Sequence, residues 1–139
     1  MKKILMIIFI FILCNSLKAI EKTYGDLVVS KLVSVYDGDT FTVNLFNTPD
    51  IIGEKISVRM SGVDTQEIKD KDATKRAKAQ LAKKFTLDKL IKAKVITLKN
   101  IKRDKYFRLD AEVYVDTENL GESLIKQGLG YAYYGGTKE

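Results

Sequence analysis

The alternation of apolar and polar positions predicts a series of short strands. Five segments follow the period of two that is typical of a half-buried strand. They are residues 27–36, 40–46, 54–60, 94–99 and 108–115. Asp-Gly at residues 37–38 predicts a tight turn between the first two. A longer hairpin loop, which holds the only proline of the chain at position 49, is expected between the second and the third.

A long helix is predicted at residues 73–92, which are rich in strong helix formers. Ala77, Leu81 and Phe85 recur at helical spacing and predict its buried stripe, which Leu87, Leu90 and Ile91 extend. The lysines of the opposite face suit either a nucleic-acid contact or, as is more common for such a run, a solvated surface.

A short helix is predicted at residues 120–127, where Gly128 suits a left-handed cap at its C-terminal end. No regular structure is expected in the leader 20–26, the loop 64–72 or the tail 129–139. Five strands with a helix after the third match the layout of an OB-fold barrel. The predicted class is therefore α+β, mainly β: a five-stranded OB-fold barrel with one long and one short helix. Such barrels commonly bind oligonucleotides, although a fold alone does not give a function.

Residues 1–19 have the pattern of a secretory signal peptide, with two lysines, an apolar run of eleven residues and a polar stretch that ends at Ala19. A membrane-spanning helix needs about 20 apolar residues. We expect one exported domain, secreted or periplasmic, at residues 20–139. The alternative is an uncleaved anchor. Lipidation of Cys14 is disfavoured, because Leu13 stands where a small residue is expected.

Composition limits the metal chemistry of the expected domain. Removal of residues 1–19 takes away three lysines and no acid, so the formal charge falls from +6 to +3. The remainder has no histidine and no cysteine. Zinc sites are therefore excluded, and a metal site would use oxygen ligands, which suit calcium or magnesium.

Two acidic clusters and two arginines lie next to predicted strands. If the second and third strands are neighbours, Asp39 and Asp64 meet at one rim of the barrel and can hold a cation. Glu67 follows closely and could deprotonate a water molecule, while Arg59 and Arg108 can each grip a phosphate through two hydrogen bonds. Together these groups predict phosphodiester hydrolysis. Each also has a plainer reading, because the acids could only turn the chain and the arginines could only pair with acids.

Four motifs occur in a fixed order, at residues 37–40, 59–67, 104–108 and 122–129. They read Asp-Gly-Asp-Thr, Arg-Met-Ser-Gly-Val-Asp-Thr-Gln-Glu, Asp-Lys-Tyr-Phe-Arg and Glu-Ser-Leu-Ile-Lys-Gln-Gly-Leu. Over about residues 27–134 the chain resembles the staphylococcal (thermonuclease, micrococcal) nuclease family. The resemblance implies an OB-fold, calcium-dependent, secreted endonuclease that cleaves DNA and RNA and leaves 3′-phosphate ends.

The resemblance also implies roles for the acidic residues. Asp39, Asp64 and the carbonyl of Thr65 match the calcium ligands of the family, and Asp37 matches an acid beside them. Glu67 matches the glutamate that is assigned as general base.

The basic and aromatic matches lie later in the chain. Arg59 and Arg108 match the two arginines that bind the phosphate, and Lys105 and Tyr106 match residues that contact a terminal phosphate. A tyrosine near the end of the match stacks on the base. Tyr131, Tyr133 and Tyr134 are candidates for it, and Tyr134 has the best spacing.

The chain departs from the family pattern at four places. Gln66 replaces a proline, and Phe107 stands where the type member has a glycine before Arg108. The loop from Glu67 to the long helix is shorter, and the last helix of the type member is missing. One alternative is a non-catalytic nucleic-acid-binding OB module, exported or membrane-tethered. Another is a membrane-tethered surface protein with a structural calcium, which would retain residues 1–19. For the nuclease we expect a monomer without stable membrane association.

Overall fold

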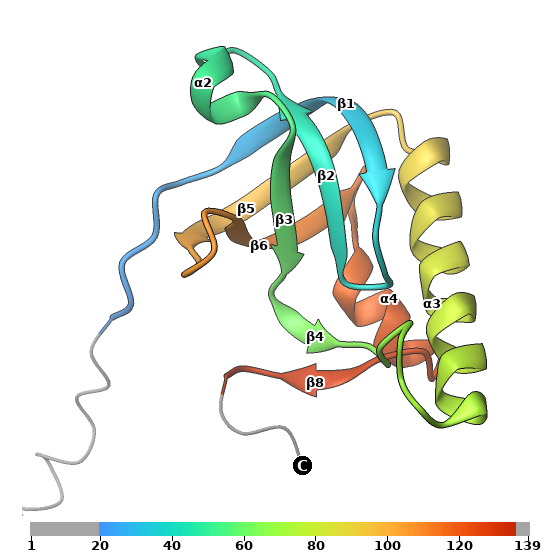
Figure 1. The fold of residues 1–139 in the computed structure, drawn as a ribbon. Coiled ribbons are helices and arrows are strands. Elements are labelled where there is room, and N and C mark those ends of the chain that lie inside the picture. The colour runs from blue at the N-terminus through green and yellow to red at the C-terminus, as the bar shows by residue number, and fades with distance from the viewer. Residues whose placement is uncertain (1–19, 136–139) are drawn as a thin grey trace, which may run out of the picture.

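A computed structural model describes residues 20–135 (Figure 1). The predicted signal peptide, at residues 1–19, lies outside the described residues. Within residues 20–135, none of the helices has the length and hydropathy that a membrane crossing requires.

Five strands form a closed barrel, as the sequence predicts. They are β1 (Leu27–Val35), β2 (Thr40–Leu45), β3 (Ile56–Met60), β5 (Ile96–Arg103) and β6 (Leu109–Val115). Their order is β3-β2-β1-β5-β6 with antiparallel neighbours, and β6 closes the barrel by pairing in parallel with β3. Closure leaves the barrel strands without a free edge. The α+β OB-fold class is therefore confirmed.

The barrel interior is filled by the apolar side chains of the alternating strands. Phe41, Val58, Leu98 and Val113 are fully buried. Ile56, Val58 and Met60 share the buried face of β3, as their alternation predicts. The core therefore sits inside the barrel and leaves the strand ends at its rim available for polar groups.

Three helices occur in the described part of the chain: α2 (Asp50–Gly53), α3 (Ala73–Lys92) and α4 (Leu120–Lys126). The bounds of α3 match the prediction. Asp72 caps α3 by accepting hydrogen bonds from the backbone N–H groups of Thr74 and Lys75, at 2.8 and 3.1 Å. Gly128, after α4, has the expected positive φ of 69°. α2 is an additional single turn in the β2–β3 loop.

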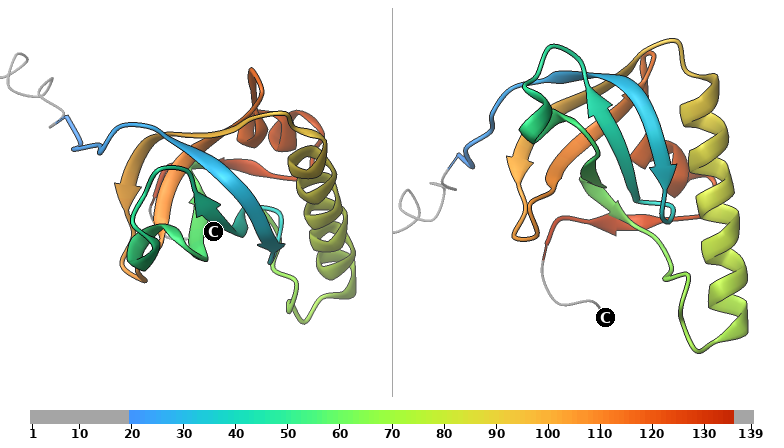
Figure 2. Two further views of the ribbon diagram at one scale, coloured as in Figure 1. Left: turned by 90° about the horizontal axis from the view of Figure 1, so that it is seen from above. Right: turned by 45° about the horizontal axis from the view of Figure 1, so that its top comes forward.

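The predicted buried stripe of α3 is only partly right. Leu90 is buried, and Phe85 and Leu87 pack against the core. Ala77 is exposed, however, and so are Leu81, at 59%, and Ile91, at 65%. The other buried positions are Ala79, Ala82 and Thr86, which the pattern did not select. The reason is a close approach of α3 to the β1–β2 turn, where a Cβ atom on Gly38 would lie 2.7 Å from the Cβ of Ala82. Small residues allow this contact, and α3 stands along one side of the barrel in both views of Figure 2.

A second, two-stranded sheet joins residues that follow β3 to the tail, and the sequence predicted a strand in neither place. β4 (Gly62–Asp64) pairs antiparallel with β8 (Tyr131–Tyr133). The register places Asp64 opposite Tyr131. Close packing of Gly130 supports the sheet, because a Cβ atom there would lie 2.7 Å from Val63 Cγ2. A further short strand, β7 (Glu118–Asn119), extends the main sheet beyond β6.

The leader at residues 20–26 is fixed to the barrel, contrary to the expectation of a loose segment. The Tyr24 N–H donates to the carbonyl of Ile101 at 2.7 Å, and the Ile101 N–H donates to the carbonyl of Gly25 at 3.0 Å. β5 is also longer than predicted, because it continues past residue 99 to Arg103. The leader and the end of β5 therefore run side by side.

Candidate active site

One cleft of about 880 Å³ gathers nearly all the predicted site residues at the barrel rim. Asp37, Asp39, Arg59, Asp64, Glu67, Lys105, Tyr106, Arg108 and Tyr134 all line it. Thr65 does not line the cleft and is buried behind it. The fold therefore brings together groups that are far apart in the sequence, while their chemical roles remain predictions.

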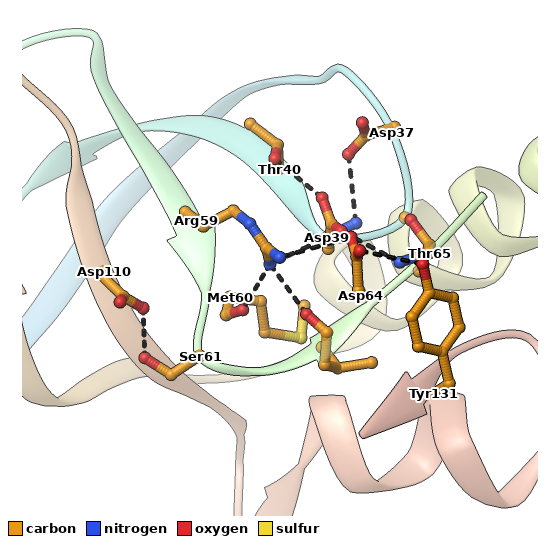
Figure 3. Close-up of polar contacts among 12 residues, drawn as sticks. Asp37, Asp39, Thr40, Arg59, Met60, Ser61, Asp64, Thr65, Asp110 and Tyr131 are labelled. Carbon is orange, nitrogen blue, oxygen red and sulfur yellow. Dashed lines mark hydrogen bonds and ion pairs between the residues drawn. The ribbon is translucent and has the colours of Figure 1, made fainter. Parts of the chain in front are cut away.

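The β1–β2 turn presents Asp39 through a dense set of hydrogen bonds (Figure 3). The Asp39 N–H donates to Asp37 Oδ1 at 3.2 Å. The carboxylate of Asp39 accepts from Thr40 Oγ1 at 2.9 Å and from the Thr65 N–H at 3.1 Å. Its own carbonyl accepts from the Met60 N–H at 2.8 Å. Asp39 is therefore fixed to both β3 and the loop after β4.

Packing against α3 holds this turn from behind. Thr86 Oγ1 donates to the carbonyl of Gly38 at 2.7 Å in a buried position. A side chain at Gly38 would also collide with Thr65, whose Cγ2 lies 2.8 Å from the ideal Cβ position. The long helix therefore supports the site without lining it.

Arg59 lies between the two buried carboxylates. Its Nη1 is 3.5 Å from Asp39 Oδ2, and its Nη2 is 3.4 Å from Asp64 Oδ1. Nη1 also donates to the carbonyls of Met60 and Val63, at 2.7 and 2.8 Å. The guanidinium is thus oriented by backbone oxygens, as Figure 3 shows.

Asp64 receives a contact that sequence reasoning did not assign. Tyr131 Oη donates to Asp64 Oδ2 at 2.9 Å. Tyr131 was one of three candidates for a base-stacking residue, but its hydroxyl points to the carboxylate (Figure 3). No pattern within the tail distinguishes these tyrosines, because the contact depends on the β4–β8 register.

Burial and neighbouring carboxyl groups raise the affinity of Asp39 for protons. The pKa of Asp39 is raised to about 8, first by burial and then by the hydrogen bond with Asp37. The positive charge of Arg59 opposes the shift, whereas the charge of Asp37 and a hydrogen bond with Asp64 add to it. At Asp39, burial and the neighbouring carboxyl groups therefore outweigh the positive charge of Arg59.

The residues present fit an oxygen-binding cation in their chemistry. Asp39 and Asp64 are 5% and 2% exposed, and both face the cleft. The buried Thr65 Oγ1, next to them, has no hydrogen-bond partner within residues 20–135. In the same described range, no group of three or more His, Cys, Asp or Glu side chains is arranged to hold a metal ion. A cation here would therefore also need backbone or water oxygens.

Arg108 enters the cleft from the start of β6. Its Nε donates to Asp104 Oδ2 at 2.6 Å, and its Cζ lies 5.5 Å from the centroid of the Tyr106 ring. The Lys105 Nζ lies 5.0 Å from the same ring. Phe107, which replaces the glycine of the family, has a φ of 51° and an exposed side chain. The left-handed backbone is therefore kept without glycine, and Arg108 still lines the cleft.

The remaining predicted residues are more exposed. Glu67 lies in the loop between β4 and α3, and Tyr134 is 90% exposed at the end of β8. Ser61 and Asp110, which sequence reasoning did not select, also line the cleft and are joined by a hydrogen bond from Ser61 Oγ.

Comparison with known proteins defines the class. The family described as "Staphylococcal nuclease homologue" matches residues 57–139. The chain belongs to this family, which confirms the resemblance seen in its motifs.

Several curated relatives carry nuclease names. The chain is 36% identical to Endonuclease YncB of Bacillus subtilis over 124 residues, which is 85% of this chain and 56% of that protein. It is 32% identical to the Thermonuclease of Staphylococcus hyicus over 115 residues, or 82% and 61% of the two chains. An uncharacterized endonuclease of Haemophilus influenzae is 31% identical over 103 residues, or 74% and 51%. The chain therefore spans between about half and three fifths of the length of these relatives.

Proposed function

We propose that this protein is a calcium-dependent endonuclease that hydrolyses phosphodiester bonds of DNA and RNA and leaves 3′-phosphate ends. One observation supports this most strongly: two arginines, the buried pair Asp39 and Asp64, and Glu67 line a single cleft. A protein that only bound nucleic acid would not need a water-activating acid beside two phosphate-binding arginines. The relatives whose names are endonuclease and thermonuclease support the same reaction.

Calcium is the proposed cofactor, held by Asp39, Asp64 and the carbonyl of Thr65, with Asp37 beside them. When bound, it supplies positive charge to the phosphate that is attacked. The raised pKa of Asp39, which comes first from burial, supports this assignment, because a divalent cation would stabilise the buried carboxylate.

Protein side chains carry out the remaining steps, which are proton transfer and the stabilisation of negative charge. Glu67 accepts a proton from the water molecule whose oxygen attacks phosphorus. Arg59 and Arg108 stabilise the negative charge that grows on the equatorial phosphate oxygens. The bond from phosphorus to the 5′ oxygen breaks, so the products are a 3′-phosphate and a 5′-hydroxyl.

Contacts to the rest of the substrate are proposed for the exposed part of the cleft. Lys105 and Tyr106 contact a terminal phosphate, and Tyr134 stacks on a base. Stacking on an aromatic ring tolerates any base, which suits an enzyme that takes both DNA and RNA. Export without stable membrane association is part of the proposal, on the basis of the predicted signal peptide at residues 1–19. Action as a monomer is proposed as well.

The test is degradation of plasmid DNA and of RNA by the purified protein with calcium, with magnesium and with a chelator. The proposal predicts loss of both substrates with calcium and protection by the chelator. An absence of degradation under every condition, in a sample shown to be folded by circular dichroism, would contradict it and favour the nucleic-acid-binding module.

A further inference from the structure

The cleft extends beyond the predicted catalytic groups to an ion pair. Lys102 Nζ lies 2.6 Å from Glu21 Oε2, and both residues line the same cleft as Arg108. The side chain of Lys102 is 30% exposed and that of Glu21 is 70% exposed. Neither residue belongs to the four motifs that carry the family resemblance.

Strand register places Lys102 in line with Arg59, one of the two arginines proposed to bind phosphate. Lys102 on β5 is opposite Asp110 on β6, and Asp110 is opposite Arg59 on β3. Adjacent strands lie about 4.8 Å apart, so the backbones of Lys102 and Arg59 are separated by roughly 10 Å. In the nucleic-acid substrate, the phosphate next to the one that is attacked can reach a cation at this distance.

The leader holds Glu21 over Lys102. Residues 24 and 25 exchange backbone hydrogen bonds with Ile101, next to Lys102. The Tyr24 ring lies 5.0 Å from the Cζ of Arg103, and Asp26 Oδ1 accepts from the Asn100 N–H at 2.9 Å. The ordered leader therefore positions the carboxylate of Glu21 in the cleft.

We propose that Lys102 forms a second phosphate subsite of the cleft and that Glu21 occupies this subsite until a substrate phosphate displaces it. This inference rests on the proposed function, because it takes a polynucleotide as the ligand. Breaking the ion pair between Glu21 and Lys102 costs little free energy, since an exposed ion pair contributes little stability in water. A phosphodiester carries one negative charge, as the carboxylate does, so the ammonium group keeps a charge-assisted hydrogen bond after the exchange.

The experiment measures the Kd of a fluorescein-labelled single-stranded oligothymidylate in chelator, where no calcium-dependent cleavage occurs. Glu21→Gln should tighten binding about two- to fivefold, the range of an exposed ion pair. Lys102→Met should weaken it and reduce the slope of log K against log salt by about 0.7, as expected when one phosphate contact to a single strand is lost. Lys102→Arg should retain binding, and Glu21→Gln should have no effect in the Lys102→Met background.

A matched ion pair outside the cleft provides the control. Lys84 Nζ lies 2.6 Å from Asp88 Oδ2 on α3, and neither residue lines the cleft. Asp88→Asn and Lys84→Met make the same changes in net charge and should leave the Kd nearly unchanged. Equal changes in Kd for the variants at the two ion pairs would overturn the inference, because they would show a general effect of net charge.

The inference and the proposed function can fail separately. Calcium-dependent cleavage by the wild type, together with Kd values that do not respond to changes at Glu21 and Lys102, would overturn only the subsite. A thermal melt of each variant checks that it is folded. Absence of cleavage with every divalent cation would overturn the proposed function, while the Kd comparison would still decide whether Lys102 binds phosphate.

Discussion

The two halves of the cleft are built in different ways. In the acidic half, which consists of Asp37, Asp39, Arg59 and Asp64, the carboxylates of Asp39 and Asp64 are almost fully buried. In the exposed half, which consists of Lys105, Tyr106, Arg108 and Tyr134, two aromatic rings are 68% and 90% exposed. The acidic half is held in place by backbone pairing between strands. The exposed half lies on the β5–β6 connection and on the residues after β8.

This difference matches the tasks that we propose for the halves. Groups that stabilise developing charge act best when they are fixed before the reaction. Arg59, oriented by two carbonyls, meets that requirement. Groups that receive a variable nucleotide benefit from exposure and from loops, where binding residues are commonly found.

Substitution of the two arginines by alanine would separate the halves most clearly. Both Arg59→Ala and Arg108→Ala should lower the cleavage rate by about 10³- to 10⁵-fold, because each removes a cation from the transition state. Only Arg59→Ala should lower the free energy of unfolding substantially, by about 1–3 kcal/mol, since it leaves two carbonyls without their donor. Arg108→Ala should change it by less than about 1 kcal/mol, because it breaks one partly exposed pair. Rates come from single-turnover assays and stabilities from urea titrations; near-normal rates for either variant would refute its assigned role.

Glu67→Gln should reduce the rate by about 10²- to 10⁴-fold, the usual contribution of a general base. Calcium affinity, measured by calorimetry, should be retained, because Glu67 is not among the proposed ligands. Glu54→Gln makes the same change at an exposed residue outside the cleft and should leave the rate unchanged. If Glu67→Gln cleaves as fast as Glu54→Gln, the residue does not activate water.

The acidic half should make the stability of the calcium-free protein depend on pH. The pKa of Asp39 is about 8 in the folded protein and near its ordinary value of 3.8 when unfolded, so between about pH 4 and pH 8 the folded state binds more protons. Stability should therefore fall as the pH rises through this window, and calcium should reverse the fall. Urea titrations at several pH values would measure it. Asp39→Asn should remove this contribution, and an unchanged pH profile in that variant would show that Asp39 is not its source.

Tyr131→Phe should have the smallest effect. Loss of its hydrogen bond to Asp64 should raise the half-saturating calcium concentration about two- to tenfold, the value of one such bond. Affinity for a single-stranded oligonucleotide in chelator should stay the same. An unchanged half-saturating calcium concentration would show that this hydrogen bond does not support the proposed calcium site.

Sequence patterns predicted the acidic half better than the exposed half for a physical reason. The β2–β3 hairpin pairs residues that are close in sequence, so Thr40 opposite Arg59 follows from local alternation and turn chemistry. Arg108 reaches the cleft through the parallel β3–β6 pairing, which joins segments that are distant in the sequence. The motif spacing therefore located the residues but not the contacts between them.

Three features depended on tertiary contacts that no local pattern records. β4 and β8 have three residues each and exist because they pair with each other. The buried face of α3 includes Ala82, which fits against Gly38 and which the spacing of the larger apolar residues did not select. The ordered leader depends on its pairing with β5.

The division of labour between the halves can be measured directly. We would follow single-turnover cleavage of a labelled single-stranded DNA by the wild type and by Arg108→Ala over a range of calcium concentrations. The account predicts calcium-dependent cleavage by the wild type, and for Arg108→Ala a much lower maximal rate with an unchanged half-saturating calcium concentration. No calcium-dependent cleavage by the wild type, or a loss in Arg108→Ala that saturating calcium restores, would contradict it.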